Sequence, residues 1–300
     1  MDYKSLYKDE DFGEVLFDQL LKDYTTWGIG GPSDVLVKVK SKEQLQNLLK
    51  FNHKNNIPTT VIGRGSNLLV TDKGIRGCVL LLADNYDFIS VDGNKLTAYA
   101  GSKLNSAALF AIENSLIGME EISGIPGSVG GAVAMNAGAY GKEIKDICLS
   151  VNAFDYFGNE YNFTNEQMNF SYRHSKIFDD NLIVSSATFN LAYDENNQAK
   201  AKYEDYTNRR ASKQPLDKKS AGSTFKRPEG SYASKLIDEC GLRGYAVGDC
   251  AVSEKHCGFI INKGNATSEE MLKFIDHVAN IVYEKTGFKL EREVKLIGEE

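Results

Sequence analysis

Two glycine-rich segments have the composition of loops that bind anions. One is Gly63-Arg64-Gly65-Ser66-Asn67, and the other runs Gly124-Ile125-Pro126-Gly127-Ser128-Val129-Gly130-Gly131. Glycine has no Cβ and adopts positive φ freely, so consecutive backbone N–H groups can converge on an anion such as a pyrophosphate. Alternatively, each loop only turns the chain at the edge of a sheet, where glycine is also common. Spacing alone leaves both interpretations open, although two such loops beside predicted strands strengthen the first.

A basic segment in the last third of the chain offers a second place for an anion. Residues 209–227 contain seven Lys and Arg side chains against a single acid, Asp217, although the whole chain has a net charge of −6. A ligand that carries a diphosphate and a carboxylate suits such a local excess of positive charge. The alternative is the solvated end of a helix, which we favour for the first three of these residues. The seven are Arg209, Arg210, Lys213, Lys218, Lys219, Lys226 and Arg227.

Other kinds of site find no support in the sequence. It contains neither G-x-G-x-x-G nor G-x-x-x-x-G-K-[ST], so we expect neither a Rossmann dinucleotide site nor a P-loop. No cluster of His, Asp or Cys predicts a metal site, and His256 fits a structural role better than a catalytic one. The cysteines form no C-x-x-C pair and lack metal-ligand spacing, so we expect reduced structural thiols. There are five of them, Cys78, Cys148, Cys240, Cys250 and Cys257.

Strands and helices must hold these loops on both sides. Hydrophobic periodicity and turn residues predict strands at 35–40, 58–62, 78–82, 88–91, 96–100, 147–157, 182–193, 259–262 and 290–297. They predict helices after Ser41, at 104–114, 195–213 and 232–240, and from Thr267 to near Gly287. Ser41 with Gln44, and Thr267 with Glu270, have the spacing of capping boxes. Hairpin signals among mixed elements favour an α+β fold over a regular parallel βαβ series.

Length and composition exclude several classes of protein. Three hundred residues, 42% of them hydrophobic and 25% charged, suit one large domain or two ordinary ones. The net charge of −6 argues against a nucleic-acid partner. The longest strongly apolar run, 78–83, is far shorter than the roughly 18 to 20 residues of a membrane span. The first fourteen residues lack the basic-then-apolar order of a secretory signal. We therefore expect a cytoplasmic protein without a membrane partner.

Six motifs occur in order along most of the chain. They are Thr25–Pro32, Gly63–Leu69, Gly124–Gly131 with Asn136–Gly141, Tyr172-Arg173 with Ser175 and Phe178, Ala221–Ser223 with Phe225-Lys226 and Pro228, and Glu293-Val294 before Ile297-Gly298. Together they resemble the motifs of the UDP-N-acetylenolpyruvoylglucosamine reductase family. The sequence departs from that family at Thr25, where asparagine is usual.

The resemblance implies a particular fold and division of the chain. Its expected form is a two-lobed α+β FAD-binding domain of the vanillyl-alcohol oxidase and p-cresol methylhydroxylase type, over residues 1–195. An α+β substrate-binding domain would follow over residues 196–300, with its last strand packing back on the first domain. The short connection between Arg173 and Ser223 is that of the family's compact type. This type lacks the loop whose tyrosine closes over the substrate.

The resemblance also implies a cofactor and the residues that hold it. FAD would bind non-covalently, without a Rossmann fingerprint, between the two glycine loops and the N-A-G-A-Y-G motif. The implied cofactor-binding residues are Gly63, Arg64, Gly65, Ser66, Asn67, Leu68, Gly124, Ile125, Pro126, Gly127, Ser128, Gly130, Gly131, Asn136, Ala137 and Gly138.

The implied reaction reduces UDP-N-acetylglucosamine enolpyruvate to UDP-N-acetylmuramate, a step of peptidoglycan precursor synthesis. Hydride would pass from NADPH to the flavin and then to the enolpyruvyl methylene carbon. Arg173 would stabilise the charge that spreads into the carboxylate, Ser223 would donate a proton, and Glu293 would polarise the carboxylate or orient a neighbour. The simpler alternatives are a surface ion pair for Arg173, a turn role for Ser223 and an exposed charge for Glu293.

The substrate would also need contacts to its anionic groups. Lys219 and Arg227 flank Ser223 more closely than the other basic residues do, so we expect these two to bind an anion. Tyr172, in the motif of Arg173, completes the implied substrate contacts.

Two rival functions remain open. One is another flavin oxidoreductase of the same superfamily, acting on an alcohol or a phenol. Many such relatives tether FAD through His or Cys, whereas neither glycine loop contains either residue and the nearest histidine, His53, falls in a predicted helix. The other is an inactive nucleotide-sugar-binding protein, which the presence of Arg173, Ser223 and Glu293 disfavours.

Overall fold

The chain folds into two compact units whose segments interleave along the sequence. The computed structural model describes residues 2–8 and 10–299. Unit 1 comprises Met1–Phe17, Asp34–Arg64 and Gly77–Arg209, and unit 2 comprises Asp18–Ser33, Gly65–Arg76 and Arg210–Glu300. The border between the units falls inside the first glycine loop, directly after Arg64.

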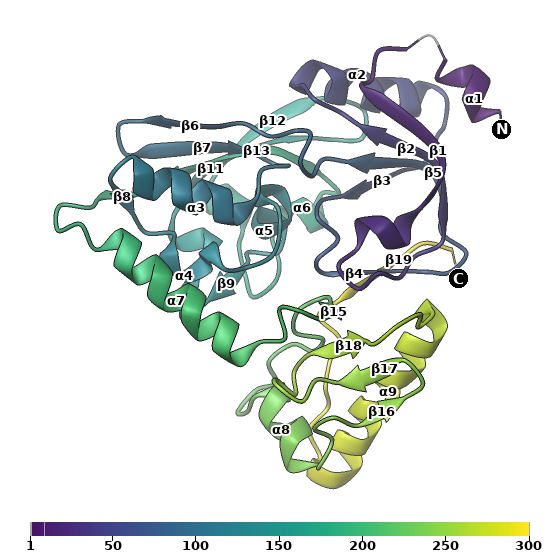
Figure 1. The fold of residues 1–300 in the computed structure, drawn as a ribbon. Helices are drawn as coiled ribbons and strands as arrows, with labels where there is room; N and C mark the ends of the chain where they lie inside the picture. The colour runs from purple at the N-terminus through teal and green to yellow at the C-terminus, as the bar shows by residue number, and fades with distance from the viewer. Residues whose placement is uncertain (1, 9, 300) are drawn as a thin grey trace. The chain divides into compact units, whose positions relative to one another are not determined.

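The first sheet of unit 1 has four strands in the order β1-β2-β5-β3 (Figure 1). Its strands are β1 (Glu14–Leu20), β2 (Pro32–Lys38), β3 (Thr59–Ile62) and β5 (Ile75–Leu81). β3 and β5 run parallel. Helix α2 (Lys42–Lys54) buries Leu45, Leu48 and Leu49 in the same apolar core as Val35 and Val37 of β2. The first glycine loop therefore leaves the sheet at the carboxyl end of β3.

The second sheet of unit 1 has five antiparallel strands in the order β12-β11-β13-β7-β6. Its strands are β6 (Ile89–Asp92), β7 (Lys95–Tyr99), β11 (Cys148–Phe154), β12 (Glu160–Thr164) and β13 (Ile183–Asn190). Helices α3 (Leu104–Glu113) and α5 (Val129–Ala134) pack on this sheet and on each other, and Figure 1 shows α3 running across it. The second glycine loop leads into α5, so the packing of α5 on this sheet holds that loop in place.

Short elements complete unit 1. They are α1 (Tyr3–Leu6), β8 (Leu116–Ile117), α4 (Glu120–Ser123), β9 (Gly138–Ala139), β10 (Lys142–Glu143), η2 (Ile144–Asp146), η3 (Glu166–Met168), α6 (Lys176–Asp179) and β14 (Ala192–Tyr193). Helix α7 (Ala199–Lys213) follows, and the border between the units falls within it, after Arg209. In unit 1, Asn105 of α3 donates its Nδ2 to the hydroxyl of Tyr203 at 3.0 Å, which fixes α7 beside α3.

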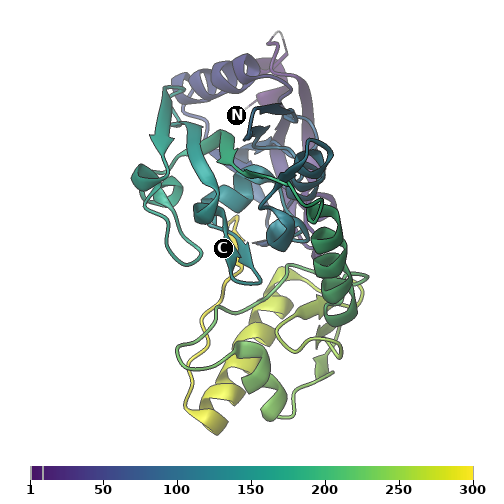
Figure 2. The ribbon, with the colours of Figure 1, turned by 90° about the vertical axis from the view of Figure 1, so that its left-hand side faces the viewer.

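Unit 2 is built around a four-stranded antiparallel sheet in the order β15-β18-β17-β16. Its elements are η1 (Leu21–Tyr24), β4 (Leu68–Val70), β15 (Lys219–Ser220), α8 (Ala233–Glu239), β16 (Ala246–Val247), β17 (Cys250–Val252), β18 (Ile260–Asn262), α9 (Ser268–Thr286) and β19 (Lys295–Ile297). Figure 2 shows α8 beside α9, and both share an apolar core with the sheet. β19 pairs in parallel with β4.

The predicted helix caps agree well with the structure. Thr267 and Glu270 form a complete capping box at the start of α9, which ends at Gly287 with φ +76°. Ser41 caps α2 by accepting from the N–H of Gln44 at 3.1 Å. The Gln44 side chain, however, accepts from the N–H of Lys40 at 2.9 Å instead of reaching back to Ser41.

Three predicted segments have different bounds for identifiable reasons. The strand expected over 147–157 ends at Phe154, because the Asp155 carboxylate accepts from the next N–H groups and forms a turn. The helix expected from residue 195 begins at Ala199, where Asp194 accepts from its N–H at 2.9 Å. Of the strand expected over 290–297, only Lys295–Ile297 is a strand. Residues 291–293 bond instead to the segment after Ser223.

Sequence patterns missed the seven-residue strand β1 and the shorter strands β4, β8, β9, β10, β12, β15, β16 and β17. The α+β class itself is confirmed by the mostly antiparallel sheets and separate helices. Over residues 2–8 and 10–299, none of the helices combines the length and apolar character that a bilayer span requires.

Candidate active site

The two glycine loops touch each other within unit 1. A Cβ added to Gly63 would lie 2.5 Å from Oγ of Ser128, so any other residue there would displace the Ser128 hydroxyl or the loop. Ser128 caps α5, and its Oγ accepts from the N–H of Gly131 at 3.4 Å. A Cβ at Gly130 would similarly come within 2.8 Å of the Ala100 Cβ. The absence of a side chain at Gly63 therefore lets the first loop approach Ser128 of the second. The same absence at Gly130 lets the second loop approach Ala100, directly after β7.

Some N–H groups of the second loop are already used inside the protein. Val129 donates to the carbonyl of Ser102 at 2.8 Å, and Gly130 donates to that of Ala100 at 2.9 Å. The carbonyl of Gly127 accepts from the N–H of Leu104 at 3.1 Å. These bonds fasten the loop to the end of β7 and the start of α3, and they reduce the number of its N–H groups that can face a ligand.

The side chain of Arg64 lies in an exposed charge cluster. Its Nη1 contacts the two Asp84 carboxylate oxygens at 2.6 and 2.7 Å. Lys103, directly before α3, lies 3.7 Å from the same carboxylate and forms a β-bridge with Ser128. Asp84 thus links a cation of the first loop to one beside the second.

Asn136 joins the N-A-G-A-Y-G motif to the loop that carries Tyr172 and Arg173. It is fully buried with φ +40°, and its Nδ2 donates to the carbonyl of Ser171 at 3.0 Å and to Glu143 at 3.1 Å. Its Oδ1 accepts from the N–H of Lys145 at 2.9 Å. All of this amide's bonding is with protein, so its side chain shapes the motif.

Arg173 is held in an uncommon backbone conformation beside this motif. Its φ is +58°, its Nη2 donates to the carbonyl of Gly138 at 3.5 Å, and its guanidinium lies 4.8 Å from the centre of the Tyr172 ring. Positive φ is an uncommon conformation for residues other than glycine, and residues that adopt it are enriched at functional sites. Unit 1 therefore brings Arg173, Tyr172 and Gly138 together.

Unit 2 brings Ser223 and Glu293 onto neighbouring segments. The N–H of Glu293 donates to the carbonyl of Thr224 at 2.8 Å, and Phe225 forms a β-bridge with Arg292. Ser223 is exposed and Glu293 is half-buried. Main-chain bonds of the next residue, Thr224, therefore hold the segment of Ser223, the candidate proton donor, beside Glu293, the candidate acid.

The unit 2 part of the first glycine loop is bonded to the same segment. Nδ2 of Asn67 donates to the carbonyl of Glu293 at 3.4 Å, and the carbonyl of Asn67 accepts from the N–H of Lys295 at 3.0 Å. The loop then continues into β4, which pairs with β19. A predicted cofactor loop and a predicted catalytic carboxylate are therefore held together.

The Thr25–Pro32 motif, for which the sequence analysis found no role, connects these parts of unit 2. The N–H of Thr26 donates to the carbonyl of Gly65 at 3.3 Å, and its Oγ1 donates to that of Ser220 at 2.7 Å. Gly28 has φ +65°, and a Cβ there would lie 3.1 Å from Cδ of Lys219. The motif thus braces β15 and supports the side chain of Lys219.

The remaining basic residues of 209–227 have varied surroundings. Arg209 pairs with Asp205 at 2.7 Å, Lys218 with Asp217 at 3.2 Å and Lys226 with Glu291 at 3.2 Å. Arg227 is exposed, with its guanidinium 4.1 Å from the centre of the Tyr232 ring. Of the predicted site residues, Tyr172 and Arg173 belong to unit 1, whereas Ser223, Glu293, Lys219 and Arg227 belong to unit 2.

The thiols and His256 have the surroundings of structural groups. The five cysteines are free and buried, and burial raises the pKa of Cys78 to about 11 and that of Cys148 to about 12. Burial also lowers the pKa of His256, whose Nδ1 accepts from the N–H of Gly258 at 3.1 Å. Within the described residues, no group of three or more His, Cys, Asp or Glu could hold a metal ion.

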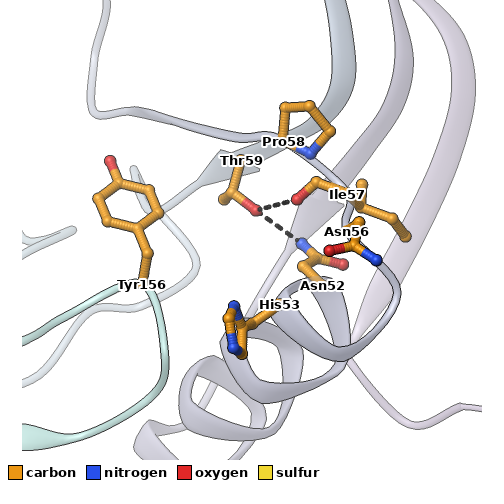
Figure 3. Close-up of a pocket in the computed structure, with 7 residues that line it drawn as sticks. All are labelled: Asn52, His53, Asn56, Ile57, Pro58, Thr59 and Tyr156. Atoms are coloured by element: carbon orange, nitrogen blue, oxygen red, sulfur yellow. Dashed lines mark hydrogen bonds between the residues drawn. The ribbon is translucent and has the colours of Figure 1, made fainter.

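A separate cavity of about 340 Å³ lies at the other end of β3 (Figure 3). His53 of α2 and Tyr156 lie on either side of it, and Asn52 donates to Oγ1 of Thr59 at 2.9 Å at its base. The cavity lies at the amino end of β3, whereas the glycine loop follows the carboxyl end. It therefore contains none of the predicted site residues.

The residues present fit a flavin nucleotide in one specific respect. Without a Cβ, Gly63 packs directly on Ser128 and Gly130 on Ala100, so the two glycine loops lie side by side, where main chain from both can face one doubly charged ligand. Comparison with known proteins agrees. Residues 33–163 match the model of an FAD binding domain, and residues 214–297 match that of the UDP-N-acetylenolpyruvoylglucosamine reductase C-terminal domain.

Whole-chain relatives decide the family. A UDP-N-acetylenolpyruvoylglucosamine reductase of Clostridioides difficile is 45% identical over 287 residues, which are 96% of this chain and 94% of that protein. Another, from Caldanaerobacter subterraneus, is 45% identical over 96% of this chain and 95% of its own. This chain belongs to the UDP-N-acetylenolpyruvoylglucosamine reductase family. The crystal structure of the reductase from Thermus caldophilus is 35% identical, with a TM-score of 0.80 over 94% of this chain and 98% of that one.

Family membership confirms the FAD-binding α+β fold and the cofactor predicted from the motifs. The chain is an FAD-dependent oxidoreductase. The motifs supplied site candidates everywhere except in Thr25–Pro32, and sequence reasoning gave no role to Thr26, Gly28 or Thr224. Their contacts join segments far apart in the chain, and only the position of Gly28 in a glycine-rich motif hinted at a constraint.

Proposed function

We propose that this protein uses NADPH and bound FAD to reduce UDP-N-acetylglucosamine enolpyruvate to UDP-N-acetylmuramate in peptidoglycan precursor synthesis. The observation that carries the proposal is the hydrogen bond from the N–H of Glu293 to the carbonyl of Thr224, beside Ser223. It joins an exposed hydroxyl and a half-buried carboxylate to a segment that is also bonded to Asn67 of the first glycine loop. The names of the relatives support the substrate.

FAD, when bound, supplies hydride transfer from NADPH to the enolpyruvyl methylene carbon. We propose that it is held non-covalently by the two glycine loops and residues 136–138, mainly within residues 1–195, and that residues 196–300 supply most of the substrate contacts. Neither loop offers a His or Cys for a covalent link. The five free, buried cysteines fit a reducing compartment, and we propose a cytoplasmic location.

Each catalytic candidate would then act on charge or on a proton. Hydride addition leaves negative charge on the neighbouring carbon and its carboxylate, which the permanent cation of Arg173 would stabilise through two N–H donors. The Ser223 hydroxyl would donate its proton to that carbon. Glu293 would polarise the carboxylate or orient a neighbour.

The substrate and the serine alkoxide both need positive charge nearby. Lys219, whose stem lies along Gly28, and Arg227 would bind the anionic groups of the substrate, with Tyr172 as a further contact. Lys226 is paired with Glu291, so we assign the support of the alkoxide to Lys219. These assignments do not require a loop that closes over the substrate.

A stopped-flow experiment with two mixing steps tests the proposal. NADPH should bleach the flavin absorbance of the oxidised protein, and the enolpyruvyl nucleotide should restore it. Ser223→Ala should leave the first step nearly normal and slow the second by about 10²- to 10⁴-fold, the usual contribution of a proton donor. Ser231→Ala, a serine in the following turn, serves as the matched control and should leave both steps unchanged.

The outcomes separate the rival functions. Equal loss in both steps would reject Ser223 as the proton donor. A wild-type protein that NADPH reduces but the enolpyruvyl nucleotide does not reoxidise would contradict the substrate. Yellow flavin retained in the pellet after acid precipitation would favour an alcohol or phenol oxidoreductase, and absence of NADPH consumption would favour an inactive binding protein.

A further inference from the structure

Thr224 is a fully buried polar residue that joins three separate segments of unit 2. Its N–H donates to the carbonyl of Gly258 at 2.9 Å, and its own carbonyl accepts from the N–H of Glu293 at 2.8 Å. Its Oγ1 accepts from the N–H of Ile260 at 3.1 Å. The Thr224 hydroxyl, by accepting this hydrogen bond, anchors its own segment to β18. Removing it would leave the buried N–H of Ile260 without its partner.

The anchor is itself rigid. Ile260 is fully buried on β18, and its carbonyl accepts from Nε1 of Trp27 at 3.0 Å. Trp27 is fully buried as well, and its carbonyl accepts from Nδ2 of Asn262 at 3.0 Å. The N–H that donates to Thr224 therefore belongs to β18, a strand that pairs with β15 on one side and β17 on the other.

On the other side of Ser223, Gly222 follows the buried Ala221 and the β15 residue Ser220, whose carbonyl accepts from Oγ1 of Thr26 at 2.7 Å. Gly222 has φ +76°, and a Cβ there would meet nothing within 4 Å. Ser223 thus lies between Gly222 and the anchored Thr224. Its placement on this side depends on Thr224, and the N–H of Glu293 is bonded to the same residue.

We propose that Thr224 is a positioning residue for proton transfer from Ser223, and that its hydroxyl sets the placement of both Ser223 and Glu293. This inference rests on the proposed function, because it requires Ser223 to be the proton donor. Thr224 does not touch the reacting atoms. It acts through the main chain on Ser223, which precedes it in the sequence, and on Glu293, whose N–H bonds to its carbonyl.

Two substitutions separate the hydroxyl from the volume of this side chain. Thr224→Val keeps the shape and the backbone bonds but removes the acceptor for Ile260, whereas Thr224→Ser keeps the acceptor. We expect Thr224→Val to slow reoxidation of the reduced flavin by the enolpyruvyl nucleotide about 10- to 100-fold, as a displaced reacting group does. Flavin reduction by NADPH should stay within about twofold, and Thr224→Ser should stay within about threefold in both steps.

The solvent isotope effect gives a readout that a merely structural role would not move. In Thr224→Val the proton transfer becomes slower relative to hydride transfer, so the effect of D₂O on the second step should increase. The dissociation constant of the substrate, measured by titration of the flavin absorbance in the absence of NADPH, should change much less than the rate. A misplaced proton donor weakens the reaction more than binding.

Thr286→Val is the matched control in the same unit. The hydroxyl of Thr286 donates to the carbonyl of Val282 at 2.7 Å and accepts from the N–H of Phe288 at 3.2 Å, at the end of α9. Its loss should lower thermal stability without separating the two steps. If Thr224→Val does not yield folded flavoprotein, Thr224→Cys takes its place, since a thiol is a weaker acceptor, and an intermediate slowing of the second step is expected.

Two outcomes would overturn the inference while the proposed function holds. One is a wild-type rate for the second step in Thr224→Val, or in Thr224→Cys where that variant replaces it. The other is equal slowing of both steps, which would make Thr224 a structural residue only. Failure of the wild-type protein to be reoxidised by the enolpyruvyl nucleotide would instead refute the proposed function, so the two failures are distinguishable.

Discussion

The two units fasten their candidate residues in different ways. In unit 1 a side-chain amide holds the turn of Arg173 against the N-A-G-A-Y-G motif, because Asn136 bonds to Ser171, Glu143 and Lys145. In unit 2 main chain bonds to main chain, as Glu293 does to Thr224. The φ of +58° at Arg173 belongs to a tight turn that main-chain bonds between Ser171 and His174 close at 3.1 and 3.2 Å, so Asn136 fixes the place of this turn and the turn itself sets the backbone conformation.

Two glycines of the candidate site, one in each unit, also differ in what they face. Gly63 faces the short side chain of Ser128, whose Oγ would lie 2.5 Å from an added Cβ and also caps α5. Gly28 faces the middle of the long Lys219 side chain at 3.1 Å. A lysine stem can rotate away at little cost, but a capping serine loses its bond if it rotates. Unit 1 should therefore tolerate change at this contact less well than unit 2.

Of the substitutions at these two glycines, Gly63→Ala should have the larger effect. In Gly63→Ala the new methyl must rotate the Ser128 hydroxyl out of its cap or separate the loops, so we expect FAD affinity to fall about tenfold. Removing the hydroxyl restores the space. The double variant Gly63→Ala/Ser128→Ala should therefore bind FAD nearly as well as Ser128→Ala alone, measured by flavin fluorescence titration of the apoprotein. Strictly additive losses would show that the two loops do not constrain one another.

A smaller effect is expected at Gly28. Gly28→Ala places a non-glycine residue at φ +65°, which costs about 1 kcal/mol of stability, and pushes on Lys219. Gly230→Ala is the matched control, because Gly230 has φ +76° and nothing within 4 Å of an added Cβ. Thermal unfolding should show similar losses for both, whereas only Gly28→Ala should raise the KM for the nucleotide substrate, by about threefold. An equal KM in the two variants would remove Lys219 from the proposed site.

Local signals in the sequence predicted the parts of the fold that local physics decides. Thr267 and Glu270 fixed the start of α9, and Gly287 its end, because a capping box and a left-handed cap use only nearby atoms. The predicted strand over 290–297 failed for the opposite reason. Its first half bonds to residues near Ser223, and no local pattern contains that partner.

The candidate site divides in the same way. Motif order in the sequence was enough to select Arg173, Ser223 and Glu293. It could not identify the residues that hold them, since those depend on contacts between distant segments. The bond from Thr26 to Ser220 spans 194 residues. Threonine at position 224 looks unremarkable until β18 is seen beside it, because its burial is a property of the folded unit alone.

Burial shifts the pKa of Glu120 in unit 1 and of His256 in unit 2, with opposite consequences for the dependence of stability on pH. In unit 1, burial raises the pKa of Glu120 above its ordinary 4.5, although both carboxylate oxygens accept from the N–H of Gly118 at 3.0 Å. In unit 2, burial lowers the pKa of His256 below its ordinary 6.5. Both groups prefer their neutral form in the folded protein, but neutrality means a bound proton for Glu120 and a lost one for His256.

The smallest effects we predict follow from this difference in sign. The folded state binds the Glu120 proton more tightly than the unfolded state does, so the stability this group contributes is complete below pH 4.5 and is lost as pH rises through its folded pKa. For His256 the unfolded state binds the proton more tightly, so its contribution is complete above pH 6.5 and is lost as pH falls. Urea unfolding of Glu120→Gln and His256→Phe between about pH 4 and pH 7 measures both. Relative to wild type, the first should gain stability as pH rises and the second as pH falls; a change of the same sign in both would mean that burial does not govern these two groups.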